Sequence, residues 1–186
     1  MKKDTQKGFT LIETLVAIAI FALSITALIS ITARGIFDTN FSKNKLTASY
    51  LAIEGAELIR NVRDISALDN ISWSTVLVQE DFLGNCYEGV DSDNKCYVDG
   101  SATDSVPNLL LCEGDCPSLN YNRDTAKFNY EFADNVNNFT SIFSRTIKIV
   151  KVDENEVRVT SRVDWLQGTR PHNIEYSFDL MPWANQ

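Results

Sequence analysis

Residues 7–21, KGFTLIETLVAIAIF, set the architecture of this chain, because they lead from a basic leader into a long uncharged helix. The run that follows, residues 14–33, contains no charged residue and 15 apolar residues out of 20. At about 1.5 Å per residue, a helix of this length crosses a hydrocarbon layer of roughly 30 Å. We therefore expect one membrane-spanning helix near the N-terminus.

A short basic segment precedes the apolar run. Lys2, Lys3 and Lys7 outnumber the single acid Asp4, so the positive-inside rule keeps residues 1–8 in the cytoplasm and delivers the rest of the chain outside. Three kinds of N-terminus share these features: a plain signal anchor, a secretory signal peptide and a processed but retained helix. The secretory interpretation would use a cleavage site near Ala27.

Glu13 lies inside the apolar stretch FTLIETLVAIAIF, residues 9–21, and separates these alternatives. An ionised carboxylate within the bilayer costs about 2.5–3.5 kcal/mol on insertion scales, and such residues usually have a partner or a function. A secretory signal does not normally carry one. A cut between Gly8 and Phe9 would create a charged amine on Phe9, about one helical turn from Glu13. That amine, of the same or of a neighbouring subunit, could then pair with the carboxylate.

Gly8, Phe9, Glu13 and the apolar tail resemble the prepilin cleavage and methylation segment of type IV pilins and type II secretion pseudopilins. The resemblance implies that a prepilin peptidase cuts between Gly8 and Phe9 and N-methylates Phe9. It also implies that Glu13 aligns an incoming subunit with the Phe9 amine of its neighbour in a helical filament. The implied partners are this peptidase, other pilin or pseudopilin subunits and an inner-membrane assembly platform. The resemblance directly covers residues 1 to about 35.

The apolar pattern continues beyond the span along one face of a helix. The recurring apolar or small residues are spaced 4-3-4-3 to about residue 64: Phe37, Phe41, Asn44, Ala48, Leu51, Gly55, Leu58 and Val62. This spacing predicts an amphipathic helix that forms, with the span, one rod of about 84 Å whose outer half needs a covering domain. Residues 51–64, LAIEGAELIRNVRD, resemble the outer helix of PilV-type minor pilins and I-type minor pseudopilins, which favours a minor subunit.

Residues 66–126 show no sustained period and contain all four cysteines. An even number of cysteines in an exported domain points to disulfides. Sequential pairing, Cys86 with Cys96 and Cys112 with Cys116, is favoured because short loops close at a lower entropic cost, although two other pairings are open. A four-thiolate zinc site is a further alternative, but the spacing matches paired CxxC knuckles poorly.

The negative charge is concentrated in the same stretch. The chain has 25 acids and 17 bases, for a net charge of −8, which argues against nucleic-acid binding. Residues 79–116 alone hold nine acids and one base, so the rest of the chain sums to zero. Calcium bound by Asp91, Asp93 and Asp99 would use this charge, as in some pseudopilins, but the EF-hand pattern is not matched. A solvated acidic loop with no cofactor is the simpler interpretation.

The C-terminal part has the alternation of β-strands. Residues 141–152 and 157–165 predict a hairpin, and residues 173–180 predict a half-buried strand after a loop at 167–172. The segment 127–132 is a candidate for a fourth strand. An antiparallel sheet of three or four strands packed on the long helix gives an α+β, pilin-like fold.

We therefore expect four parts in the chain. They are a leader at 1–8, a transmembrane and assembly helix at 9–34, the outer half of the helix at 35–65, and a head at 66–186 with the acidic loop at 79–116 and the sheet at 127–181.

The expected function is structural. The single histidine, His172, and the absence of a Gly-rich phosphate loop leave no support for an enzyme. We expect a minor pilin or pseudopilin, held as a single-pass protein of the cytoplasmic membrane with its head outside, and later part of a periplasmic or extracellular filament. A filament-tip adhesin or uptake module that binds a ligand through the head is the alternative. A motility pilus, a secretion pseudopilus and a competence filament fit the sequence equally.

Overall fold

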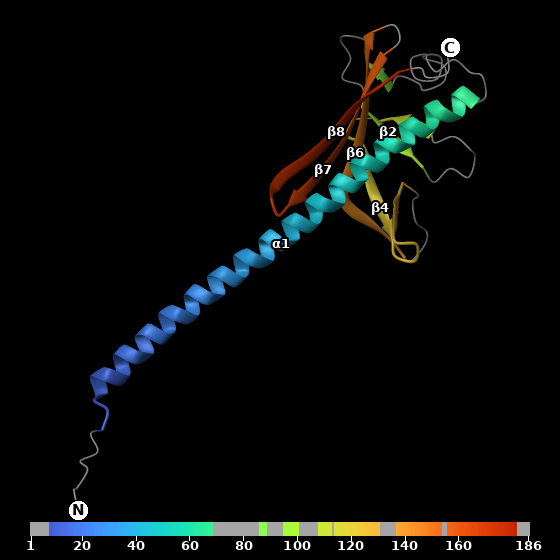
Figure 1. Ribbon diagram of the computed structural model, residues 1–186. Helices are drawn as coiled ribbons and strands as arrows, with labels where there is room; N and C mark the ends of the chain where they lie inside the picture. The colour runs from blue at the N-terminus through green and yellow to red at the C-terminus, as the bar shows by residue number, and fades with distance from the viewer. Residues whose placement is uncertain are drawn as a thin grey trace, which may run out of the picture. The chain divides into compact units, whose positions relative to one another are not determined.

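A computed structural model describes residues 8–68, 86–88, 95–100, 108–112, 114–130, 137–153 and 156–181. The chain divides into two units, Met1–Asn44 and Lys45–Gln186. One helix, α1 (Leu11–Leu68), contributes to both, and strands form the rest of the second unit (Figure 1). The strands are β1 (Tyr87–Glu88), β2 (Cys96–Asp99), β3 (Asn108–Leu111), β4 (Ser118–Asn122), β5 (Lys127–Asn129), β6 (Asn138–Asp153), β7 (Glu156–Gln167) and β8 (Arg170–Leu180).

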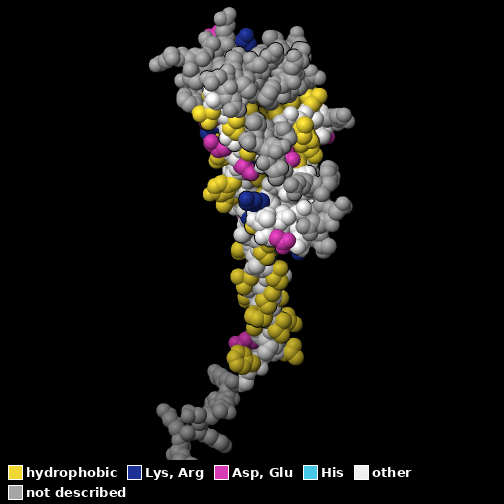
Figure 2. Space-filling model, turned by 90° about the vertical axis from the view of Figure 1, so that its right-hand side faces the viewer, with side chains coloured by type: hydrophobic (Ala, Val, Ile, Leu, Met, Phe, Trp, Pro, Cys, Tyr) yellow, Lys and Arg dark blue, Asp and Glu magenta, His cyan; other side chains and the backbone are white. Residues whose placement is uncertain are grey.

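In the first unit α1 has no buried side chain. The residues from Leu11 to Asn40 are all exposed, and Figure 2 shows hydrophobic side chains over the visible surface of this part of the helix. A helix that is apolar all round is typical of a membrane span or of the core of an assembly. The predicted continuous rod is confirmed, and it extends to Leu68.

In the second unit one face of the same helix is buried. The predicted stripe is confirmed at Ala48, Leu51, Gly55 and Val62, and the full buried set is Ala48, Leu51, Ala52, Gly55, Ala56, Ile59, Val62 and Ser66. Most of these residues are small, so the helix approaches the sheet closely. A Cβ built on Gly55 would lie 2.6 Å from Ser161 Oγ on β7, a distance that only glycine accommodates.

The sheet is organised around β6. Along one edge β6 pairs with β7, which pairs in turn with β8. Along the other edge β1, β2 and β4 pair with successive parts of β6, and β3 and β5 lie outside β2 and β4. All these pairings are antiparallel except the short one between β1 and β6. The α+β fold class is therefore confirmed.

The core lies between α1 and one face of this sheet. Ile59 and Val62 from the helix meet residues of β2, β6, β7 and β8, and the cluster comprises Ile59, Val62, Cys86, Cys96, Val98, Leu109, Ile147, Ile149, Val157, Val159 and Leu180. Burial alternates along β6 and β7, as expected for strands with one face on a core and one in water. Burying such side chains stabilises the head by about 1.5–3 kcal/mol for each large apolar residue.

The sheet is larger than three or four strands, since eight are present in the described residues. β1 to β4 fall in residues 66–126, where they are only two to five residues long. Strands this short carry too little alternation to be recognised in the sequence. β8 begins at Arg170 and not at residue 173, because Gly168 and Thr169 alone make the hairpin turn and Gly168 has a φ of +62°.

Two disulfides join the cysteines in sequence order, Cys86–Cys96 and Cys112–Cys116. Cys86 and Cys96 are part of the core. The second bridge closes the connection from β3 to β4, where the Ser144 hydroxyl donates a hydrogen bond to the Cys116 carbonyl (3.0 Å). All four sulfurs are thereby used, which leaves no thiolate for the alternative zinc site.

Candidate processing and assembly segment

The first turn of α1 is capped by Thr10. The Thr10 carbonyl accepts hydrogen bonds from the backbone N–H groups of Glu13 (3.1 Å) and Thr14 (3.3 Å). The Thr10 hydroxyl oxygen also accepts from the Glu13 N–H, at 3.4 Å. Thr10 and Glu13 have the spacing of a capping box, and an acid in the first turn is favourable at the positive end of the helix dipole. Glu13 therefore also has a local role in starting the helix.

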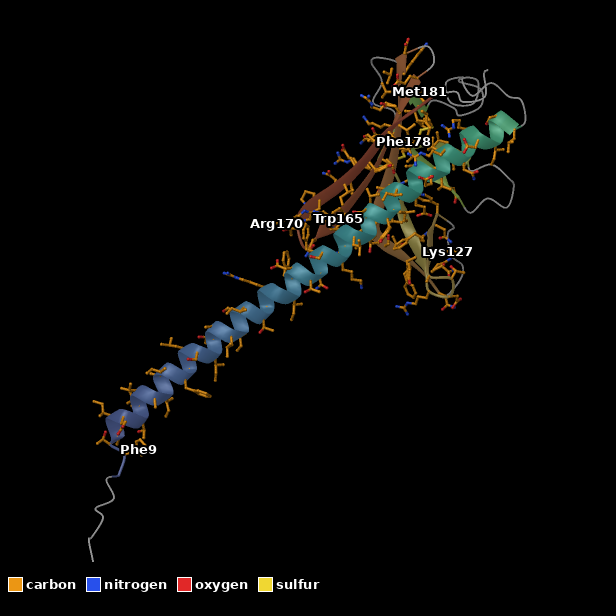
Figure 3. All side chains as sticks on the ribbon, viewed as in Figure 1. Phe9, Lys127, Trp165, Arg170, Phe178 and Met181 are labelled. Atoms are coloured by element: carbon orange, nitrogen blue, oxygen red, sulfur yellow. A yellow bond between two sulfur atoms is a disulfide. The ribbon has the colours of Figure 1, made fainter. Side chains whose placement is uncertain are left out.

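Gly8 and Phe9 lie just before this cap. A Cβ on Gly8 would meet no atom within 4 Å, so nothing in the described structure demands glycine at this position. Phe9 is 82% exposed, and Figure 3 shows it at the N-terminal end of α1. Both residues are therefore accessible to another molecule.

The hydroxyl groups along the apolar part of α1 are satisfied within the helix itself. Each donates to a backbone carbonyl three or four residues earlier, at 2.8–3.0 Å: Thr14, Ser24, Thr26, Ser30 and Thr32. These bonds lower the cost of placing the hydroxyls in hydrocarbon. Between Phe9 and Ala33, Glu13 is the only ionisable side chain, so it is the one group here that still needs a partner in an apolar environment.

Comparison with known families found one match in this segment. Residues 3–29 match the family model described as the prokaryotic N-terminal methylation motif. The match includes Gly8, Phe9 and Glu13. It supports a type IV pilin-like protein. Comparison of the chain with curated proteins and with solved structures found no match.

The pilin-like segment also fits a membrane anchor. Among the described residues, α1 is the one helix long and apolar enough to span a membrane, and none of its apolar window is buried within the chain. Together with the motif, this supports membrane anchoring before assembly. The finer prediction of a PilV-type minor pilin stays a prediction.

The head contains one of the three predicted calcium ligands within the described residues. Asp99 ends β2 and lines a groove of about 840 Å³. The groove lies between α1 and β5, and its other charged residues are Glu54 and Lys127. Asp91 and Asp93 lie outside the described residues. In the described part of the chain no three His, Cys, Asp or Glu side chains gather to hold a metal.

A buried arginine connects the helix to the sheet, and it was not among the expected site residues. Arg145 on β6 is 3% exposed. Its guanidinium donates to the carbonyls of Leu51 on α1 (3.3 Å) and Val98 on β2 (2.9 Å), and to the half-exposed carboxylate of Glu54 (3.4 Å). Three elements therefore depend on one side chain. A basic residue facing inward in an alternating strand was the available signal.

Tyr130 lies beside this arginine. Its hydroxyl donates to the Arg145 carbonyl (3.4 Å), and its ring is 4.7 Å from that of Tyr97. Burial raises the pKa of Tyr130 to about 12, against the opposing effect of the nearby Arg145 charge. The phenol is therefore a neutral part of the core at physiological pH.

Proposed function

We propose that this protein is a minor pilin or pseudopilin, a structural subunit of a type IV pilus or a type II secretion-like filament. A prepilin peptidase would cleave it between Gly8 and Phe9 and methylate the new amine. The observation that carries the proposal is the methylation motif at residues 3–29, placed at the start of a helix with an exposed apolar surface. The role is structural and not enzymatic.

The charge of the processed N-terminus explains how Glu13 would act. Cleavage would leave a positive amine on Phe9, one residue before the cap at Thr10, where the helix dipole is also positive. This amine and the Glu13 carboxylate are each unfavourable alone in an apolar environment, and pairing them removes both costs. Pairing between neighbouring subunits would then fix the position of each helix in the filament.

Mass spectrometry of the membrane-extracted protein tests processing directly. The expected N-terminus is Phe9 carrying one added methyl group. Gly8→Ala should block cleavage, whereas Gly35→Ala, at a helix position that is equally open, should leave it unchanged. An intact Met1, or a mature chain that starts beyond Ala27, would contradict the proposal.

Filament incorporation tests Glu13 separately. Glu13→Gln keeps the size of the side chain but removes its charge, so cleavage should proceed while incorporation into sheared filaments is lost. Thr10→Ala is the matched control, because it weakens the same cap and keeps the carboxylate. Normal incorporation of Glu13→Gln would refute the pairing role. Loss in both variants would assign the effect to the cap.

A further inference from the structure

The head contains two groups of basic side chains that differ in their partners. Six of the cations pair with an acid: Arg60 with Glu57, Arg63 with Asp64, Lys95 with Asp115, Arg145 with Glu54, Arg158 with Asp179, and Arg162 with Asp164 and Glu175. Lys45, Arg123, Lys127, Lys151 and Arg170 are exposed and form no ion pair within the described residues.

Four of these five cations, all except Lys151, lie at one end of the second unit. Arg123 is in the turn between β4 and β5, Lys127 begins β5, and Arg170 begins β8 after the β7–β8 turn. Figure 1 shows both turns at the same end of the sheet. Lys45 is the first residue of this unit, and Thr47 lines a groove together with Lys127. We call this the basal end.

Exposed apolar side chains accompany the cations at the basal end. Phe139, Ile142 and Leu166 are 42%, 50% and 59% exposed. The Arg123 guanidinium lies 4.0 Å from the centre of the Phe139 ring. Leu166 is paired with Pro171, next to Arg170 in the strand. Cations beside exposed apolar groups are typical of surfaces that bind the interface of a lipid bilayer.

The opposite end of the sheet carries acids beside its cations Lys151 and Arg158, and Arg158 pairs with Asp179. Asp153 and Glu156 flank the β6–β7 turn, and Asp179 lies near the end of β8. At the basal end the one acid in the β4–β5 turn is Asp124, and its carboxylate accepts a hydrogen bond from the Asn137 amide (2.7 Å). The exposed unpaired cations of the head are therefore concentrated at the basal end, which is suited to an anionic surface.

We propose that the basal end binds anionic phospholipid headgroups while the protein is anchored in the membrane. Residues 34–44 connect the expected span to Lys45, and eleven helical residues extend about 16 Å. The headgroup layer takes up roughly 5–8 Å of this length, so Lys45 comes within about one screening length of the headgroups. Each cation close to an anionic surface strengthens binding by about fivefold, and the attraction is screened over about 10 Å. This function goes beyond filament assembly and depends only on membrane anchoring.

Hydrogen–deuterium exchange of the full chain in nanodiscs tests the proposal. The nanodiscs contain one copy of the chain and either phosphatidylcholine alone or phosphatidylcholine mixed with phosphatidylglycerol. Amides of the β4–β5 and β7–β8 turns should exchange several-fold more slowly with the anionic lipid, and high salt should remove the difference. The triple variant Arg123→Gln, Lys127→Gln, Arg170→Gln should lose the protection.

Lys151→Gln is the matched control. Lys151 is an exposed cation near the far end of β6 and has no ion pair in the described residues, so this variant should keep the protection. Equal exchange in both lipids, or protection that survives the triple substitution, would overturn the proposal. Protection that appears only with two copies per disc would assign the basal end to a neighbouring subunit instead. Peptidase cleavage measured on the same samples reports the proposed function independently, since a chain that fails to be cleaved still presents the basal end to lipid.

Discussion

The two parts of α1 differ in what surrounds them, although they belong to one helix. From Leu11 to Asn40 every residue is exposed and most are apolar, whereas from Lys45 to Leu68 one stripe of mainly small residues is buried against the sheet. Within the described residues the first part buries none of its side chains, so its apolar surface is available to lipid or to other subunits. The second part has a partner already, and its stability belongs to the head. A helix segment that is apolar on all sides is therefore suited to lipid or to other subunits, whereas a segment with one apolar stripe is suited to its own head.

The polar groups of the two parts differ in the same way. In the first unit the Ser and Thr hydroxyls bond to their own helix. In the second unit Arg145 reaches from the sheet to a helix carbonyl. Substitutions in the head should consequently change its stability and leave processing intact, while substitutions at Gly8 or Glu13 should change processing or filament incorporation and leave head stability intact.

Removing the core disulfide should lower head stability the most while leaving processing unchanged. β2 pairs with β6 at one position, Cys96 with Ile147, so the Cys86–Cys96 bond holds much of the β2–β3 hairpin in place. The double variant Cys86→Ser, Cys96→Ser should lose about 2–5 kcal/mol of head stability. Denaturant unfolding followed by near-UV circular dichroism measures this loss. Cleavage at Gly8 should continue at the normal rate, and a parallel loss of cleavage would show that the two units are not independent.

Replacing the buried arginine should have the next largest effect. Arg145→Met fills similar volume but removes the charged donor that reaches the Leu51 and Val98 carbonyls. A hydrogen bond to a charged group contributes about 1.5–3 kcal/mol, so we expect a loss of about 3 kcal/mol in the same unfolding measurement. Arg162→Met is the control, because that side chain is 42% exposed and its ion pairs contribute little. Equal losses in the two variants would refute the role of Arg145.

The same glycine substitution should give different results in the two units. In Gly55→Ala the new methyl would lie 2.6 Å from Ser161 Oγ and 2.8 Å from Arg145 Cδ, and such overpacking costs about 1–3 kcal/mol. In Gly35→Ala nothing lies within 4 Å of the methyl, so head stability should not fall. Thermal unfolding of both variants in one detergent compares them. A stable Gly55→Ala would mean that α1 does not pack this closely on β7.

Long periodic elements could be predicted from the sequence because repetition specifies them. The rod needed only its apolar spacing, and the β6–β7 hairpin needed only alternation on both sides of a polar turn. β1 to β4 could not be found in this way, since tertiary pairing with β6 and two disulfides hold them and local pattern does not.

The functional residues likewise divide into those that can be recognised from the sequence and those that only the folded structure brings together. Gly8, Phe9 and Glu13 are recognisable because their chemistry depends on fixed spacing along one chain. The groups that converge on Arg145 come from α1, β2 and β6, so only the folded structure brings them together. The basal end is likewise assembled from residues far apart in the sequence.

Replacing Tyr130 should change the stability of the head the least, and it should leave processing unchanged. Tyr130→Phe should cost about 0.5–1.5 kcal/mol near neutral pH, the net value of one hydrogen bond. The pKa of Tyr130 is about 12 in the folded protein and about 10 when unfolded. Because the folded pKa is higher, the contribution of this proton is complete below pH ~10 and is lost as the pH rises towards ~12. Between pH ~10 and ~12 the free energy of unfolding should therefore fall less steeply with rising pH for Tyr130→Phe than for the parent protein. The same pH dependence in both proteins would mean that folding does not raise the pKa of the Tyr130 phenol.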